Sequence, residues 1–300
     1  MSISATCTHC GKTYTLEDAL AGRKARCKVC KEVFAIPAVR PKPDEVTPGG
    51  VPIFRHPQQR PTPAPEVPSV TPYDRQITRH IERTIGAAPM VFHEIVSHDI
   101  HLDLHIVPPT GEEPSEEHPL GTHHYTVVTS GLSARPQNVA PRALESVSPY
   151  QELMIALPGD WPGMRPDGTF DKAAMEDPCN WWPFAFLKLV ARMPHEYQTF
   201  LAPGVTIPNG EAAEPFADNT KLGCVMTFPS ILSPNAKELQ INDQITIQFY
   251  ALWPIYPEEM QLKLNQGLEP LLDKLIKAEM TELVQIERPN LCKKKGWFGR

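Results

Sequence analysis

The chain has 300 residues, of which 41% are hydrophobic and 21% charged, and its formal net charge is −6. This length exceeds that of one small module and suits one core of about 200 residues with an appendage. No run of about 18 uninterrupted apolar residues occurs, which excludes a membrane-spanning helix. The first residues, MSISATCTHC, lack the basic and apolar regions of a secretory signal, so we expect a cytoplasmic protein.

The charge is distributed unevenly. Residues 1–36 contain six lysines and arginines against three acidic residues, whereas residues 73–300 contain 19 against 29. An acidic body is a poor surface for nucleic acid and suits a basic protein partner. Three of the seven cysteines, Cys179, Cys224 and Cys292, are scattered, and we expect them to be free thiols in a reducing compartment.

Two cysteine pairs open the chain. Cys7 and Cys10 form the first pair, Cys27 and Cys30 form the second, and 16 residues separate the pairs. Each pair can bring two sulfurs to about 2.3 Å from one ion, and four thiolates complete a tetrahedral shell without a position for water. We therefore predict that residues 1–36 form a zinc ribbon that binds one structural Zn²⁺ and folds with it.

This segment resembles a small zinc-ribbon type that is common at the N-termini of bacterial proteins, through CTHCGK, LEDALAGRKARC and VFAI. It departs from that type at Lys31, where glycine is usual. Arg23, Lys24, Arg26 and Lys28 raise the hypothesis of a nucleic-acid-binding regulator. However, four thiolates and one Zn²⁺ carry a charge of about −2, which offsets most of the positive charge. We therefore favour a docking role over nucleic-acid binding.

Residues 37–72 contain eleven prolines in 36 positions. Proline removes a backbone donor and fixes φ, so neither a helix nor an interior strand is expected here. We predict a disordered, proline-rich linker that is semi-rigid and extended.

The pattern becomes globular from residue 73 onward. Tyr73, Ile77, Ile81 and Ile85 are spaced four apart and Gly86 follows, which predicts an amphipathic helix. Alternating, β-rich segments bounded by turn residues predict strands. These segments are MVFHEIVS, HLDLHIVPP, HHYTVVTSG, QELMIALP, GCVMTFP, QITIQFYALWPI and, as a closing strand, ELVQI.

Helices are expected in the later part of the chain. Pro183 and Pro194 each suit a first turn, which predicts two short helices in WWPFAFLKLVARMPHEYQTFLAPG. A further helix pair, or one helix interrupted at Gly267, is predicted over 257–280, with Glu258 and Glu259 in its first turn. Strands occur in runs and helices gather later, so the fold class is α+β, with a mixed or antiparallel sheet and flanking helices.

The histidine-rich segment SHDIHLDLHIVPP supports two interpretations. In a strand, His101, Asp103 and His105 share one face. Two histidines and a carboxylate could bind a metal ion, which raises the hypothesis of a metal-dependent enzyme. The alternative is a strand with a polar, solvated face, which we favour because a flat strand spreads these side chains too widely.

Six phrases in order resemble the bacterial form of the Suppressor-of-fused (SUFU) domain, over about residues 75–292. They are VFHEIVSHDIHLDLHIVPPT, YTVVTSGLSARP, ELMIALPGDWP, WWPFAFLKLVARMPHEYQTFLAPGVTIPNG, ITIQFYALWPIYPEEMQLKL and RPNLC. The resemblance implies an α+β binding domain over 73–300 without catalytic activity. Animal members hold a short peptide as an added strand between two lobes, and bacterial relatives resemble immunity proteins that bind toxins. Ala134 and Val205 depart from the residues common in the family.

Aromatic residues are candidate anchors for a partner, because they dominate binding hot spots. Trp181, Trp182, Trp253 and Tyr250 are the candidates, each with core packing as the alternative. We select Trp182 and Tyr250, together with the strand residues His101, Asp103 and His105, as predicted partner contacts. The leading hypothesis is a protein-binding scaffold that sequesters a partner such as a toxin by strand addition or groove capture.

Overall fold

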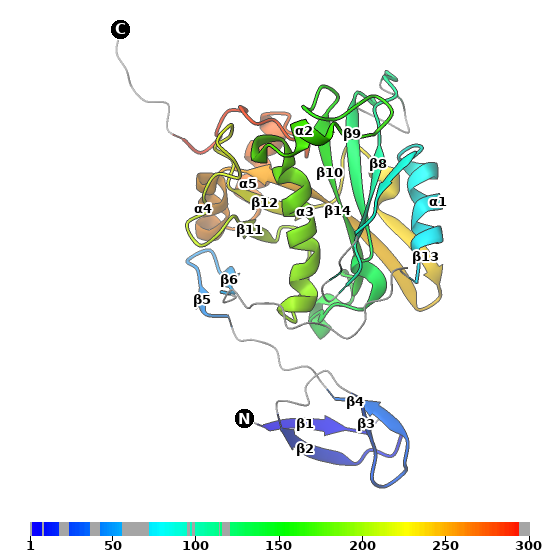
Figure 1. Ribbon diagram of the computed structural model, residues 1–300. Helices are drawn as coiled ribbons and strands as arrows, with labels where there is room; N and C mark the ends of the chain where they lie inside the picture. Colours follow the sequence, from blue (N-terminus) through cyan, green and yellow to red (C-terminus); the bar gives the residue numbers. More distant parts are fainter. Residues whose placement is uncertain are drawn as a thin grey trace.

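The computed structural model describes residues 2–7, 9–17, 24–36, 43–55, 72–94, 97, 100–113, 115 and 121–293 (Figure 1). Of the predicted linker, it describes residues 43–55 and 72, so the prediction for the rest of that segment lies outside the described residues. Among the described residues, no helix combines the length and the hydropathy needed to cross a membrane.

The N-terminal segment consists of two hairpins, each with one cysteine pair in its loop region. Strands β1 (Ser2–Thr6) and β2 (Thr13–Glu17) form the first, and β3 (Lys24–Arg26) and β4 (Val33–Ala35) form the second. Both cysteine turns close in the same way: the amide of Gly11 donates to the Cys7 carbonyl at 2.9 Å, and that of Lys31 donates to the Cys27 carbonyl at 3.0 Å.

Gly11 and Lys31 occupy equivalent positions in these two turns. Their φ angles are 71° and 65°, so Lys31 adopts the left-handed conformation that glycine accepts more readily. The departure at Lys31 therefore leaves the geometry of the second turn unchanged.

The C-terminal body is built on one eight-stranded sheet. Seven strands follow the order β11-β12-β14-β10-β9-β8-β7, and β13 also pairs with β14. Only the pair formed by β10 and β14 is parallel, so the sheet is mixed and mostly antiparallel. The strands are β7 (Met90–Phe92), β8 (Asp103–Val107), β9 (His124–Ser130), β10 (Tyr150–Pro158), β11 (Thr206–Pro208), β12 (Cys224–Phe228), β13 (Glu238–Asn242) and β14 (Ile245–Ile255).

Helices cover both faces of this sheet, as Figure 1 shows for α1 and α3. Leu104 and Ile106 of β8 pack in the same buried cluster as Phe184 and Leu187 of α3. Val107 of β8 packs on the opposite face with the isoleucines of α1 and with α4 and α5 residues. The helices are α1 (Asp74–Thr84), α2 (Lys172–Met175), α3 (Pro178–Glu196), α4 (Pro257–Gln266) and α5 (Glu269–Lys277).

The predicted α+β class and the predicted mixed sheet are confirmed, and so is the helix pair interrupted at Gly267. The two short helices expected around Pro183 and Pro194 are wrong, because α3 continues through both prolines. Each proline removes one intrahelical hydrogen bond, but both are buried with the apolar face of α3, and this packing stabilises the continuous helix.

Other differences concern short strands. The predicted closing strand ELVQI contributes one isolated bridge, from Leu283 to Ala156, and no strand. Strands β11 and β13 were not predicted from the sequence. Both are short, and β13 alternates charged or polar residues with apolar ones, ending at a bulge between Gln240 and Asn242.

A further small hairpin lies within the proline-rich segment. Strand β5 (Glu45–Val46) pairs with β6 (Pro52–Ile53), separately from the main sheet. Over residues 43–55 the structure therefore differs from the disordered, extended linker that the sequence predicts, because the turn at Gly49 and Gly50 lets two short strands pair.

Candidate functional site

The four N-terminal cysteines converge on one point. Their sulfur atoms all lie within 4.8 Å of one another. The Sγ atoms of Cys7 and Cys30 are 3.6 Å apart, and so are those of Cys10 and Cys27. Four sulfurs at about 2.3 Å from one zinc ion would be separated by about 3.8 Å in a tetrahedron, so this donor set fits Zn²⁺. In the part of the chain that is described, no other group of three or more cysteines, histidines and carboxylates meets this criterion.

A second layer of hydrogen bonds surrounds Cys27. The hydroxyl of Tyr14 lies 3.0 Å from the Cys27 Sγ, and the amide of Val29 donates to the same sulfur at 3.4 Å. The amide of Lys28 donates to the Tyr14 oxygen at 2.9 Å, which leaves the Tyr14 hydrogen to point at the sulfur. The Tyr14 ring stacks on Phe34, with ring centroids 5.5 Å apart, so its position is fixed.

The histidine strand of the body is buried on both faces. His101, Asp103 and His105 are 7%, 6% and 2% exposed. The expectation of a solvated polar face is therefore wrong. The start of α1 lies beside His105, the segment after β7 covers Asp103, and His101 precedes β8. His105 Nε2 lies 3.8 Å from a carboxylate oxygen of Asp74, the first residue of α1.

Asp103 is the centre of a hydrogen-bond network rather than of a metal site. Its carboxylate contacts His93 Nδ1 and His101 Nε2 at 3.0 Å each, and it accepts the amide of Glu94 at 3.0 Å. His101 Nδ1 lies 2.7 Å from the hydroxyl of Ser97. These bonds fasten the segment after β7 to β8.

His105 does not join this network. Neither of its ring nitrogens has a hydrogen-bond partner, and burial lowers its pKa, which favours the neutral ring. Asp103 and His105 therefore act with different neighbours, and the three residues of the enzyme hypothesis do not converge on one point.

Trp182 and Tyr250, the aromatic side chains selected from the sequence, are also buried, at 5% and 4% exposure. Trp182 stacks on Phe216, with centroids 4.5 Å apart and an interplanar angle of 3°. The Tyr250 hydroxyl donates to Gln248, and burial raises the pKa of Tyr250 to about 12. Direct contact of a partner with these residues stays a prediction, and the structure offers it little exposed surface.

The neighbouring residue, Trp181, lies closer to the surface. Phe92, Phe170 and Trp181 are half-buried and form what we call the aromatic patch. The Phe92 ring lies 5.8 Å from the rings of Phe170 and Trp181, and Lys188 Nζ lies 5.2 Å from the Phe92 centroid. The sequence names Trp181 as a candidate, but only the packing of α3 on the sheet leaves it partly accessible while Trp182 is buried.

The aromatic patch borders β7, which is an end strand of the sheet in the described part of the chain. Natural end strands are usually blunted by proline, charge or bulges. β11 contains Pro208, and β13 contains Glu238 and a bulge. β7 has the sequence Met-Val-Phe, without proline, charge or bulge, and like β11 it is only three residues long, which itself limits pairing. Of the outer strands, β7 is therefore the most suitable for pairing with another chain.

Buried ion pairs support this architecture. Glu259 is fully buried and paired with Arg288, whose Nη1 donates to Glu259 Oε1 at 2.8 Å. Glu94, beside β7, contacts Lys188 at 3.4 Å and pairs with Arg192 of α3. The predicted place of Glu259 in the first turn of a helix is correct, but no local sequence pattern predicts its pairing with a residue 29 positions later.

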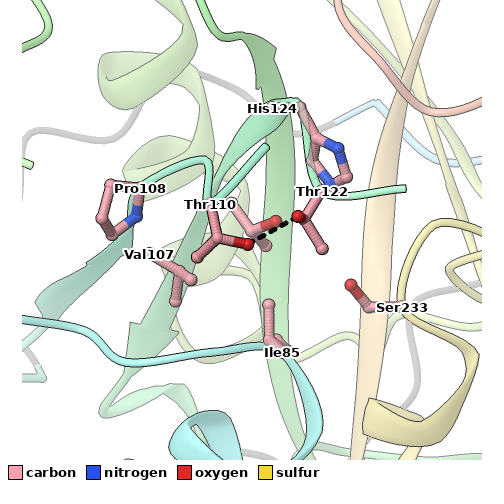
Figure 2. Close-up of a pocket in the computed structure, with 8 residues that line it drawn as sticks. Ile85, Val107, Pro108, Thr110, Thr122, His124 and Ser233 are labelled. Atoms are coloured by element: carbon pink, nitrogen blue, oxygen red, sulfur yellow. Dashed lines mark hydrogen bonds between the residues drawn. The ribbon is translucent and has the colours of Figure 1, made fainter. Parts of the chain in front are cut away.

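The cavities lined by described residues include a small one and a larger one. The smaller, of about 20 Å³, lies between Val107, Thr110, Thr122 and Ser233, as Figure 2 shows. Thr110 and Thr122 share a hydrogen bond of 2.6 Å beside it. This volume holds about one water molecule. The larger, of about 340 Å³, is an open surface pocket beside Asp218, Lys221 and Glu287.

Comparison with known proteins identifies the family. The family model described as "Suppressor of fused protein (SUFU)" matches residues 98–289, which is more than half of the chain. The chain belongs to the SUFU family. The matched residues include β8 to α5 and Arg288, whereas the cysteine cluster and β7 lie before them.

Solved structures agree with the SUFU fold. A SUFU homologue from Neisseria gonorrhoeae is similar with a TM-score of 0.50 at 16% identity, over 74% of this chain and 98% of that one. Drosophila Suppressor of Fused gives 0.50 at 12% identity, over 74% of this chain and 51% of that one, so the match spans about half of the Drosophila chain. A chain of the Sufu–Fu complex has a TM-score of 0.49 at 11% identity, over 72% of this chain and 91% of that one. A search of curated proteins found no significant match.

Proposed function

We propose that this SUFU-family chain is a non-catalytic, cytoplasmic protein-binding scaffold that sequesters a protein partner. The observation that best supports this proposal is the end strand β7, which has no proline, charge or bulge, beside the aromatic patch. An extended segment of the partner would add to β7, its main chain supplying hydrogen bonds and its side chains contacting Phe92 and Trp181. Half-buried aromatic rings supply contact area at a low cost in conformational entropy.

The charge of the body and the family support a basic protein as the partner. The body over 73–300 carries 29 acidic residues against 19 basic ones, which favours a basic partner through long-range attraction. Neutralisation of a toxin domain is the form of sequestration that resemblance to immunity proteins suggests. Nucleic acid is disfavoured as a ligand of the body for the same electrostatic reason.

The pairing can be tested with a charge placed on the end strand. Val91 of β7 is half-buried and lies opposite His105 across the strand pair. We expect Val91→Lys to weaken partner capture at least about tenfold, because a lysine on an end strand opposes pairing. The measurement is quantitative pull-down from the native source with full-length bait. Ile276→Lys, at a 73% exposed position on α5, is the matched control and should retain capture.

Equal recovery of the partner with both variants would exclude β7 as the binding strand. Failure to recover any stoichiometric protein with the unaltered chain would count against the binding function itself. Intrinsic tryptophan fluorescence verifies that both variants are folded.

We further propose that Cys7, Cys10, Cys27 and Cys30 hold one structural Zn²⁺. The convergence of four sulfurs supports this, and so does the hydrogen-bonded layer around Cys27. Zinc would cross-link the two hairpins and neutralise part of the thiolate charge, which a small segment with five core residues requires in order to fold.

The outer layer of this site allows a second test. Tyr14→Phe keeps the ring that stacks on Phe34 and removes the hydroxyl next to the Cys27 sulfur. We expect zinc affinity to fall by about 10- to 100-fold, as for other outer-layer partners of metal ligands. Competition with a chromophoric chelator measures the affinity, and Tyr73→Phe, outside the ribbon, is the control. An unchanged affinity would show that the hydroxyl does not stabilise the thiolate.

A further inference from the structure

The hairpin formed by β5 and β6 is an ordered element inside the proline-rich segment. The amide of Asp44 donates to the Ile53 carbonyl at 2.8 Å, and that of Thr47 donates to the Val51 carbonyl at 3.0 Å. The Thr47 hydroxyl accepts the amide of Val51 at 3.1 Å, and Thr47 is only 7% exposed. A side chain buried to this degree in a two-stranded hairpin requires a covering surface from elsewhere in the chain.

That surface is the C-terminal end of α4. The last four carbonyls of a helix have no partner within the helix. In α4, the Lys263 carbonyl accepts the amide of Gly267 at 2.9 Å, and the Leu264 carbonyl accepts the amide of Gly49 at 3.3 Å. The hairpin turn therefore caps α4 from outside.

The approach at this contact is close enough to require glycine. A Cβ atom on Gly49 would lie 2.7 Å from the Leu264 oxygen, 2.9 Å from the Asn265 carbonyl carbon and 3.0 Å from the Gln266 nitrogen. All three are backbone atoms, which cannot move aside cheaply. At the next position, Gly50, a Cβ would meet nothing within 4 Å.

The ion pair that follows β6 lies within the hairpin itself. Arg55, which follows β6, forms an ion pair with Glu45 at 2.9 Å. Its pKa is raised mainly by this hydrogen bond, with smaller contributions from Asp44 and from Glu211, which follows β11. The amide of Gly49 on the Leu264 carbonyl is the contact that places the hairpin beside α4, and Figure 1 also draws β5 and β6 on the α4 side of the body.

We propose that the C-terminal end of α4 is a docking site for the turn Thr47–Gly50 of the linker, and that this docking sets the reach of the zinc ribbon. Ile36 and Asp44 are eight residues apart, so the chain between them spans at most about 29 Å. A free linker from Ile36 to Tyr73 would span up to about 130 Å. Docking thus keeps the ribbon beside the α4 side of the body, where its effective concentration is higher.

Hydrogen exchange tests the docking. It is measured on the unaltered full chain and on its variants Gly49→Val and Gly50→Asn. Gly49 is outside the left-handed region, so valine tests the contact rather than the backbone conformation. Gly50 has a φ of 73°, which asparagine tolerates, and its surroundings are open. We expect exchange over 45–53 to be about tenfold faster in Gly49→Val and unchanged in Gly50→Asn. Small-angle scattering should show a larger maximum dimension for Gly49→Val alone.

Zinc content and the unfolding of the body should be equal in the three proteins, so the result does not depend on a partner or on the zinc proposal. Exchange over 45–53 that is as fast in the unaltered chain as in Gly49→Val would overturn the docking. Equal maximum dimensions would overturn the claim that docking sets the reach of the ribbon.

Discussion

Replacement of Glu259 by alanine is expected to destabilise the body by about 3–5 kcal/mol, because it leaves the Arg288 guanidinium buried without its counter-charge. Glu259 also accepts the amides of Tyr256 at 2.9 Å and Leu291 at 3.0 Å. Arg288 donates in addition to the Pro254 carbonyl at 3.1 Å. One ion pair thus joins the end of β14, the start of α4 and the segment around residue 290. Urea unfolding followed by tryptophan fluorescence measures the loss.

The chain supplies a matched control for this change. Glu258, the preceding residue, is exposed and accepts a hydrogen bond from the Asn290 side-chain amide at 2.8 Å. Glu258→Ala should therefore cost less than about 1 kcal/mol. The double change Glu259→Leu with Arg288→Met should recover part of the loss, since it leaves no unpaired charge. Equal destabilisation by Glu258→Ala and Glu259→Ala would contradict the assigned role of the pair.

Replacement of Cys27 by serine is expected to abolish stoichiometric zinc binding and to unfold residues 1–36. Zinc binding to structural four-ligand sites supplies about 10–16 kcal/mol, which a core of five buried residues cannot replace. Elemental analysis should give one zinc per unaltered chain and none in Cys27→Ser, while the melting of the body stays unchanged. Cys179→Ser, at a position outside the cluster, is the control.

The same metal analysis separates the hypothesis of a protein-binding scaffold with one structural zinc from that of a metal-dependent enzyme. A second metal ion that survives Cys27→Ser would revive a metal site in the body. An unaltered chain that contains no zinc when purified without chelators would contradict the proposed ribbon.

Local pattern predicted most of the fold. The four-residue spacing of Ile77, Ile81 and Ile85 predicted α1, and alternation predicted the long strands, because these features depend on which side of one element is apolar. The prolines of α3 misled the prediction, since the packing of Phe184 and Leu187 against the sheet outweighs the hydrogen bonds that Pro183 and Pro194 remove.

The candidate site was less accessible to sequence reasoning. Spacing alone predicted the cysteine cluster, because the ion requires its ligands in pairs on tight turns. Alternation revealed that His101, Asp103 and His105 share a face, but not that α1 and the segment after β7 bury this face. Similarly, Trp181 and Trp182 are adjacent in sequence, and only the tertiary packing of α3 makes one partly buried and the other almost fully buried.

The central claim is that β7 binds a partner by strand pairing, and amide exchange of the purified complex tests it most directly. Exchange is measured for the unaltered chain alone and with the protein that it captures. We expect at least one amide of Met90–Phe92 to exchange more slowly in the complex, together with reduced exposure of Trp181. Protection confined to β11 or β13, with β7 unchanged, would contradict the claim.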